Sequence, residues 1–308
     1  MIYTVTLNPS LDYRMDFGHL RLGELCRATG TALTFGGKGI NVSVVLRRLG
    51  VESRALGFLG GFCGKEIAAQ LQAEGCHSDF LWLDGQNSRI NVKLLGTEET
   101  ELGAPGPVLG ERDLGRLHQK LCSLLREGDA LVLSGSAPRG VPPDVYGEIL
   151  RRLAGRGIAA VVDAGRDLLL PALEHRPLLI KPNLCELGEI FGAPPEGLPQ
   201  LLGYARQLHR RGAQNVLVSL GAQGALLLPR QGNPLYAAAP PGKAGGTTGA
   251  GDSMVAGFLA GLPQGMRHAL ALGVAAGSAT AFGEGLAGPA QIAALLAKVT
   301  VRELDGEA

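Results

Sequence analysis

The stretch ALVLSGSAPRGVPPDVYGEILRRLAGRGIAAVVD, residues 130–163, contains one complete strand–helix–strand unit. Residues 130–133 and 158–162 are short apolar runs, typical of strands buried on both faces of a parallel sheet. Residues 143–154 between them are amphipathic, as expected of the helix that connects two parallel strands. This stretch therefore predicts an α/β fold.

The same alternation continues on both sides of this unit. Further strand-like runs occupy residues 1–7, 53–58, 178–180 and 216–219, and further helical patterns occupy residues 111–126, 198–211 and 269–282. No linker divides the 308 residues. We therefore expect a single domain, residues 1–308, built on a doubly wound, mostly parallel sheet.

Polar residues follow the strands where each one ends. They are Asn8-Pro9-Ser10, Ser134-Gly135-Ser136, Asp163, Lys181-Pro182-Asn183 and Leu220-Gly221. Ligands of doubly wound sheets bind outside the carboxyl ends of the strands. We expect the functional site along this edge.

Two segments, residues 11–35 and 88–106, interrupt the strand–helix rhythm and carry strand-like alternation. They could pair as a small sheet that covers the polar edge and excludes water from it. An exposed hairpin with no role in the site is the alternative.

The composition excludes several classes of function. The 29 basic residues balance the 28 acidic ones without blocks of like charge, so no nucleic-acid partner is expected. The five cysteines are scattered, which predicts neither disulfides nor a zinc site. Residues 269–282 are too short for a membrane span, and residues 1–7 do not resemble a secretion signal. We expect a cytoplasmic protein with a small-molecule partner.

Residues 243–261, KAGGTTGAGDSMVAGFLAG, place a glycine-flanked aspartate where a turn enters an apolar helix. Gly249 and Gly251 allow backbone N–H groups to converge at the positive end of the helix, and Asp252 adds a carboxylate there. An anion site beside a base predicts phosphoryl transfer from ATP to a hydroxyl group. Alternatively, Asp252 only stabilises the helix N-terminus.

A second glycine-rich turn, Gly36-Gly37-Lys38-Gly39, precedes another helix and could bind a second anion. None of the Gly-Lys pairs in the chain is followed by Ser or Thr, so a P-loop is excluded. Residues 57–64 are rich in glycine but lack dinucleotide-binding spacing, and we interpret them as a structural turn.

Three further polar residues have two interpretations each. Asn183 and Glu186 have the spacing of a helix capping box, and Glu186 could also hold a water of hydrated Mg²⁺. Arg89 could be a solvated cation, or it could bind a phosphate through two parallel hydrogen bonds.

Together these motifs resemble the phosphofructokinase B family of ribokinase-like sugar kinases, over nearly the whole chain. The segment Thr248–Met254 is similar to the second family signature, Gly36–Val42 to the first, and Asn183 with Glu186 to the Asn-x-x-Glu element. The resemblance implies a ribokinase-like fold with a small β-sheet lid, and an enzyme that uses ATP and Mg²⁺.

The resemblance also implies roles for individual residues. Asp252 would be the catalytic base, with Gly249, Ala250 and Gly251 as the anion hole. Substrate would contact Asp12, Arg27, Gly37, Lys38, Asn41, Arg89 and Ser136. The nucleotide would contact Lys181, Asn183, Ser219, Gly221 and Gly224. Glu186, through water, and Asn183 would hold Mg²⁺.

Within the family, Gly36–Gly39, Leu133–Ser136 and Arg89 resemble the branch that acts on phosphorylated ketohexoses. The expected reaction converts fructose 1-phosphate and ATP into fructose 1,6-bisphosphate and ADP. Tagatose-6-phosphate kinase and 6-phosphofructokinase activities are alternatives, and a non-catalytic sensor of sugar phosphates or nucleotides is an alternative of another class. A kinase of nucleosides or unphosphorylated sugars would leave Lys38, Arg27 and Arg89 without an anionic partner.

The chain departs from the family pattern at Thr247-Thr248, at Ala164-Gly165-Arg166 and in residues 100–107. Arg166 could add a charge near the nucleotide. The exposed surface of the expected small sheet suggests pairing with a second copy. We therefore expect a homodimer through the lid, in which Arg27 reaches the neighbouring site.

Overall fold

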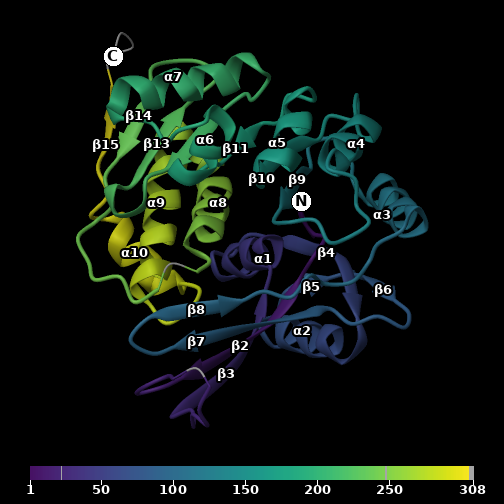
Figure 1. Cartoon of the computed structure of the whole chain (residues 1–308). Helices are drawn as coiled ribbons and strands as arrows, with labels where there is room; N and C mark the ends of the chain where they lie inside the picture. The colour runs from purple at the N-terminus through teal and green to yellow at the C-terminus, as the bar shows by residue number, and fades with distance from the viewer. Residues whose placement is uncertain (22, 247, 305–308) are drawn as a thin grey trace.

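A large mixed sheet flanked by helices and a separate small sheet make up the computed structural model of the chain (Figure 1). The structure describes residues 1–21, 23–246 and 248–304. The predicted α/β class with a small additional sheet is confirmed.

The large sheet has 11 strands, and those from β12 to β5 run parallel. Its order is β15 (Val301–Glu303), β14 (Leu235–Ala237), β13 (Ala225–Leu228), β12 (Val216–Ser219), β11 (Leu179–Ile180), β10 (Ala159–Asp163), β9 (Ala130–Ser134), β1 (Ile2–Thr6), β4 (Ser53–Gly60) and β5 (His77–Ser78), with β6 (Leu81–Leu83) beside β4. The strands β13, β14 and β15 form an antiparallel edge.

Helices cover both faces of this sheet (Figure 1). They are α1 (Lys38–Arg48), α2 (Gly61–Ala73), α3 (Glu111–Leu124), α4 (Val145–Arg152), α5 (Arg166–Leu173), α6 (Leu184–Phe191), α7 (Gly197–Arg210), α8 (Ala250–Gly261), α9 (Met266–Phe282) and α10 (Pro289–Leu296). No helix in the described ranges is long and apolar enough to cross a membrane.

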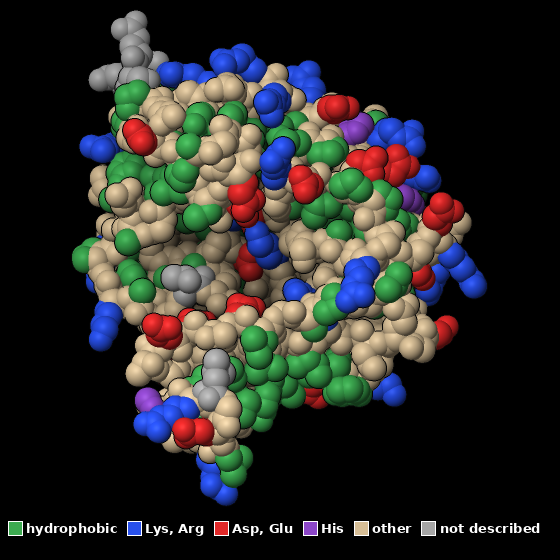
Figure 2. All heavy atoms as spheres, viewed as in Figure 1, with side chains coloured by type: hydrophobic (Ala, Val, Ile, Leu, Met, Phe, Trp, Pro, Cys, Tyr) green, Lys and Arg blue, Asp and Glu red, His purple; other side chains and the backbone are tan. Residues whose placement is uncertain are grey.

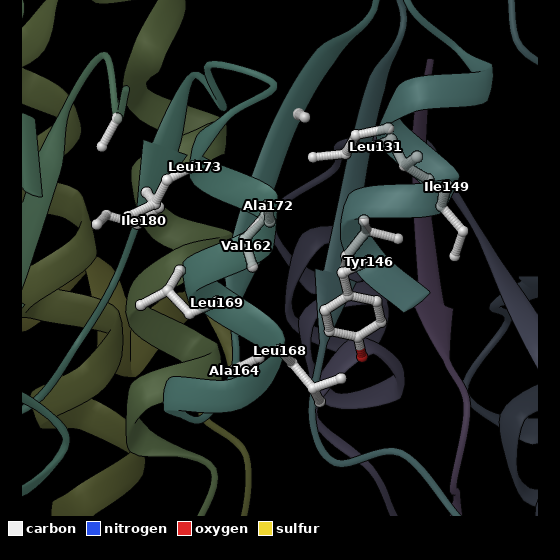
Figure 3. Packing of buried hydrophobic residues seen from close by; sticks show 14 of the residues in the cluster. Leu131, Tyr146, Ile149, Val162, Ala164, Leu168, Leu169, Ala172, Leu173 and Ile180 are labelled. Carbon is white, nitrogen blue, oxygen red and sulfur yellow. The ribbon is translucent and has the colours of Figure 1, made fainter. Parts of the chain in front are cut away.

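Alternate residues of the central strands pack into different cores, because successive strand side chains point to opposite faces. Leu131 of β9 lies in the core formed with α3, α4, α5 and α7, whereas Val132 lies in the core formed with α1, α8 and α9. Figure 3 shows Tyr146 of α4 and Leu168 of α5 beside the strand residues Leu131 and Val162.

Close packing against α9 fixes the position of α8. A Cβ atom at Gly273 would lie 3.0 Å from the carbonyl oxygen of Met254, and one at Gly277 would lie 3.0 Å from that of Ala250. Larger side chains at these glycines would push the two helices apart. The small residues of α9 therefore hold the N-terminus of α8 at the edge of the sheet.

The small sheet has the order β3 (Gly30–Gly36), β2 (Ser10–Asp16), β7 (Arg89–Leu95) and β8 (Glu99–Leu102). These strands come from the two segments that interrupt the strand–helix rhythm. One face carries Ser10, Asp12 and Asn91, and the other carries Leu11, which packs with α2. The polar face is the one that can contribute to a site.

Candidate active site

The N-terminus of α8 is formed by a glycine turn. Gly249 caps the helix with a φ of 80°, a left-handed conformation that favours glycine. Ala250 and Gly251 begin the helix, and Asp252 follows in its first turn with an exposed fraction of 6%. The first N–H groups of a helix have no partner within it, so they are available to an anion at this point.

Asn41 of α1 meets Asp252 at this helix end. Its Nδ2 atom donates a hydrogen bond of 2.7 Å to Asp252 Oδ2. Burial, followed by the negative charge of Asp163, raises the pKa of Asp252 to about 6, although the Asn41 hydrogen bond and the ammonium groups of Lys38 and Lys181 oppose the shift. A carboxylate with this pKa is poised to accept a proton near neutral pH.

Asp163, at the end of β10, lies between two lysines near the N-terminus of α8. Its Oδ1 atom lies 3.0 Å from Lys38 Nζ and 3.3 Å from Lys181 Nζ. Burial alone would raise the pKa of Asp163, but the two ammonium groups outweigh it and lower that pKa. A Cβ atom at Gly251 would lie 3.1 Å from Lys181 Nζ, so this ammonium lies against the start of α8.

Asn183 and Glu186 form the capping box at the start of α6. The Asn183 N–H donates to Glu186 Oε2 at 2.8 Å, and the Glu186 N–H donates to Asn183 Oδ1 at 2.8 Å. The other carboxylate oxygen, Glu186 Oε1, lies 3.7 Å from Lys38 Nζ. The cap therefore occupies one oxygen of Glu186 and directs the other toward the Lys38–Asp163 pair.

In the described ranges, no group of three or more His, Cys, Asp or Glu side chains could hold a metal ion alone. The site nevertheless fits a hydrated Mg²⁺ ion, which is commonly bound by one or two carboxylates together with phosphate oxygens and water. Asp163 Oδ2 is buried without a hydrogen-bond partner among the described residues, and Glu186 Oε1 faces the same cluster.

The loop after β12 lies beside the α6 cap. Ser219 pairs with Asn183 in an isolated bridge, and its N–H donates to the carbonyl of Pro182 at 3.1 Å. Gly221 and Gly224 turn the chain with φ values of 59° and 98°. A side chain at Gly224 would collide with the backbone of β14, so this turn requires glycine.

Asp12 lies on the polar face of the small sheet in a hydrogen-bond network. Its Oδ1 atom accepts from Ser10 Oγ at 2.7 Å and from Asn91 Nδ2 at 3.0 Å, and its Oδ2 atom lies 3.1 Å from Lys93 Nζ. The sequence analysis missed Asn91 and Lys93. Their signal was the strand period of two, which puts both on the same face as Arg89.

Arg89 is half-buried at the joint between the two sheets rather than solvated. Its Nε atom donates to the carbonyl of Asn8 at 3.2 Å, and its Nη1 atom donates to that of Ala104 at 3.4 Å. Burial lowers the pKa of Arg89 from its ordinary value. The guanidinium therefore connects the segment between β1 and β2 to the loop after β8.

The remaining predicted residues lie at helix ends and in loops. Gly37 caps α1 with a φ of 134°, whereas Ser136 and Arg27 are exposed in loops. Arg166 is exposed and donates to the carbonyl of Glu189 at 3.4 Å, and Thr247 lies outside the described residues. Figure 2 shows acidic and basic side chains together in a hollow between the small sheet and the main body.

Comparison with known proteins gives one family. The family model described as pfkB family carbohydrate kinase matches residues 5–293. A 1-phosphofructokinase of Bacillus subtilis is 42% identical, with 99% of this chain and 100% of the relative covered. A D-tagatose-1-phosphate kinase of Bacillus licheniformis is 37% identical, with 93% and 94% covered.

Solved structures agree with the family. A putative phosphofructokinase from Staphylococcus aureus has a TM-score of 0.86 and 42% identity, with 99% of this chain and 100% of that chain covered. Phosphofructokinase-2 from Escherichia coli, in complex with substrates and products, has a TM-score of 0.91 and 30% identity, with 96% and 98% covered.

Proposed function

Because this chain belongs to the pfkB family of carbohydrate kinases, we propose that it transfers the γ-phosphoryl group of ATP to a hydroxyl of a ketohexose phosphate. The proposed substrate is fructose 1-phosphate, phosphorylated at C6 to give fructose 1,6-bisphosphate. Tagatose phosphates and fructose 6-phosphate are the alternative acceptors, since a D-tagatose-1-phosphate kinase and a phosphofructokinase-2 solved with fructose-6-phosphate are also similar to the chain. The paired Asn41 and Asp252 argue against a non-catalytic sensor.

The hydrogen bond between Asn41 and Asp252 at the start of α8 is the observation that carries this proposal. Asp252 would accept the proton of the attacking hydroxyl, which its raised pKa of about 6 favours. The N–H groups of the turn at Gly249, Ala250 and Gly251 would stabilise the charge on the transferred group. The base, Asp252, and the N–H groups of the anion hole are then less than one helical turn apart.

Lys38 and Lys181 supply positive charge next to that turn. Each pairs with Asp163, and carboxylates near Lys38 raise its pKa above the ordinary value although burial opposes this. The Lys38 amine therefore remains protonated at neutral pH. Positioned positive charge is the main contribution that proteins make to phosphoryl transfer.

The nucleotide would occupy the edge formed by the α6 cap and the loop after β12, and would contact Lys181, Asn183, Ser219, Gly221 and Gly224. Glu186 Oε1 and Asp163 Oδ2 would hold Mg²⁺ through its waters, with Asn183 orienting Glu186. The ion would neutralise phosphate charge when it is bound.

The sugar phosphate would lie under the small sheet. Asp12 and Asn41 would bind its hydroxyls, and Arg89, Lys38, Gly37 and Ser136 would line the space around its phosphate. Arg89 is the main candidate for the phosphate ligand, because a guanidinium can bind two phosphate oxygens at once. We also propose that the reaction takes place in the cytoplasm.

We also propose a homodimer in which the small sheets of two copies face each other. Leu33, Tyr13, Val92 and Leu102 are in register across all four strands, on the face opposite Asp12. Leu33 and Leu102 are 43% and 55% exposed. A second copy would cover this apolar row and bring its Arg27 near the neighbouring substrate phosphate.

ADP release, measured with a coupled assay, tests the proposed function. Fructose 1-phosphate, fructose 6-phosphate, tagatose 1-phosphate, tagatose 6-phosphate, fructose and ribose are compared at saturating MgATP. We expect the highest kcat/KM with fructose 1-phosphate. Turnover of unphosphorylated sugars alone, or of none of the six, would contradict the proposal.

A further inference from the structure

The Asp12 carboxylate has one free acceptor position. Both lone pairs of Oδ1 are used, by Ser10 Oγ at 2.7 Å and by Asn91 Nδ2 at 3.0 Å. Oδ2 lies 3.1 Å from Lys93 Nζ in an ion pair and accepts no hydrogen bond from the described residues. A hydroxyl that donates to Asp12 must therefore bind at Oδ2, directly beside the Lys93 ammonium.

Lys93 directs its ammonium inward. It lies directly opposite Glu101 of β8, yet it pairs with Asp12, the diagonal position on β2. Its side chain is 13% exposed. An ammonium has three N–H donors, and within the described ranges Asp12 is its only partner.

Gly36 has no side chain, which leaves room for the hydrogen bonds at Asp12 Oδ1. It lies in register with Ser10, and a Cβ atom there would be 2.8 Å from Asp12 Oδ1. Any side chain at Gly36 would displace the network that orients Asp12. The carboxylate is thus held in place through its Oδ1 atom, and its Oδ2 end combines a free acceptor with the N–H donors of Lys93.

A free acceptor beside free donors matches two adjacent hydroxyl groups of a sugar. One hydroxyl donates to Asp12 Oδ2, and the oxygen of its neighbour accepts from Lys93 Nζ. We propose that Lys93 is a substrate-binding residue that, together with Asp12, recognises two adjacent hydroxyls of the acceptor sugar and selects their configuration. This inference rests on the proposed function and adds a specificity determinant to the same site.

The test compares the wild-type enzyme with Lys93→Met on fructose 1-phosphate, on its C4 epimer tagatose 1-phosphate, and on the 3-deoxy and 4-deoxy analogues of fructose 1-phosphate. We expect Lys93→Met to raise KM for fructose 1-phosphate roughly 10-fold with kcat changed less than about 3-fold, as for the loss of a binding contact. The substitution should not raise KM any further for the deoxy analogue that lacks the hydroxyl bound by Lys93. The preference between the two epimers should shrink.

Arg14→Met is the matched control. Arg14 lies directly opposite Lys93 on the same face, but it pairs with the partly exposed Asp16 at 2.8 Å. The Arg14→Met substitution also removes one positive charge but loses no contact with Asp12, and it should leave KM and the epimer preference unchanged. An equal loss in Lys93→Met on the parent sugar and both deoxy analogues would overturn the proposal, because a lysine that only neutralises Asp12 predicts this result.

Two further measurements keep the test decisive. If Lys93→Met does not fold, Lys93→Gln is measured instead, together with the wild-type enzyme on the deoxy analogues. An unchanged wild-type KM for both deoxy analogues would refute the inference. Calorimetric binding of the same sugars does not require turnover. Absence of turnover with an intact binding pattern would count against the proposed function while supporting the role of Lys93.

Discussion

Asn41 and Asp252 lie 211 positions apart in the sequence and are joined by a hydrogen bond of 2.7 Å. The bond connects the helix after the first glycine turn with the helix after the second. It uses one oxygen of the Asp252 carboxylate and leaves Oδ1 without a partner among the described residues. The free oxygen is the one that could take a proton from the acceptor hydroxyl.

Asp252→Asn should lower kcat roughly 10²–10⁴-fold with little change in KM, because it removes the base and keeps the shape of the side chain. The new amide carbonyl can still accept the Asn41 hydrogen bond, so the thermal melt should stay close to that of the wild type. Asp167→Asn is the control, since Asp167 lies in the first turn of α5 and its side chain is 83% exposed. Wild-type turnover in Asp252→Asn would refute the assignment.

The pH dependence of kcat/KM should reflect the ionisation of Asp252. Burial and Asp163 raise the pKa of Asp252 to about 6, and only the ionised form can act as a base. We therefore expect kcat/KM to rise with pH, to reach half its maximum near pH 6, and to level off above it. Asp163→Asn removes a like charge and the ion pairs that Lys38 and Lys181 make with it, so the acidic limb should move to lower pH. A pH profile of both proteins checks this, and a limb that stays in place contradicts it.

Much of the fold could be predicted because its elements have local signals. Residues 216–219 were predicted as a strand and form β12, and residues 143–154 contain α4. The antiparallel edge was not predicted. Its strands β14 and β15 have three residues each, and their pairing brings residues 235–237 to residues 301–303, which no local pattern specifies.

The candidate site also has one part that local sequence patterns predict and another part that they do not. Gly249 and Asp252 could be recognised because the turn and the helix start that they need are adjacent in sequence. The ion pair of Lys38 with Asp163 joins α1 to β10, and it depends on a strand order that periodicity does not give. Lys93 was overlooked for a related reason: the strand period places it on the same face as Arg89, but its contact with Asp12 depends on pairing with another strand.

Glu186→Gln separates the capping role from the metal role. The glutamine side-chain oxygen can still accept from the Asn183 N–H, so we expect a stability loss below about 1 kcal/mol. Loss of the charge at Oε1 should raise the Mg²⁺ concentration for half-maximal activity by about 10-fold, as for other residues that orient a hydrated metal. A magnesium titration combined with thermal melts measures both quantities.

Asp113→Asn is the matched control for this change. Asp113 is the N3 residue of α3 and makes the matching half of such a cap, because its Oδ2 atom accepts from the N–H of the N-cap residue Gly110 at 3.1 Å. It should lose a similar amount of stability without any change in Mg²⁺ dependence. If Glu186→Gln behaves like Asp113→Asn, Glu186 is only a cap.

Arg89→Ala tests the class of substrate. Loss of a charge-assisted phosphate contact should raise KM for fructose 1-phosphate roughly 10- to 100-fold. The variant also loses the bonds to the carbonyls of Asn8 and Ala104, which should affect all sugars alike. The ratio of the effects on fructose 1-phosphate and on fructose therefore isolates the phosphate contact. Arg89→Lys should recover part of the affinity, and equal losses on both sugars would indicate that Arg89 only anchors the loop.

Leu102→Glu should weaken the proposed dimer, because it puts a charge into the apolar row that includes Leu33. Light scattering over a dilution series measures the mass, and activity is followed over the same range. Val108→Glu is the control, since Val108 is 52% exposed and lies outside the two segments that form the small sheet. A monomeric wild type with undiminished kcat would refute a shared site.

Subunit mixing gives the decisive test of Arg27. Asp252→Asn and Arg27→Ala should each be nearly inactive on fructose 1-phosphate, the first through its base and the second through its phosphate contact. If Arg27 acts across the interface, a mixed dimer has one site with both lesions and one site with neither. Random exchange should then restore about a quarter of wild-type activity, because half of the dimers are mixed and each has one intact site. If Arg27 acts within its own subunit, every site in the mixture keeps one lesion, and activity stays at the sum of the two separate variants.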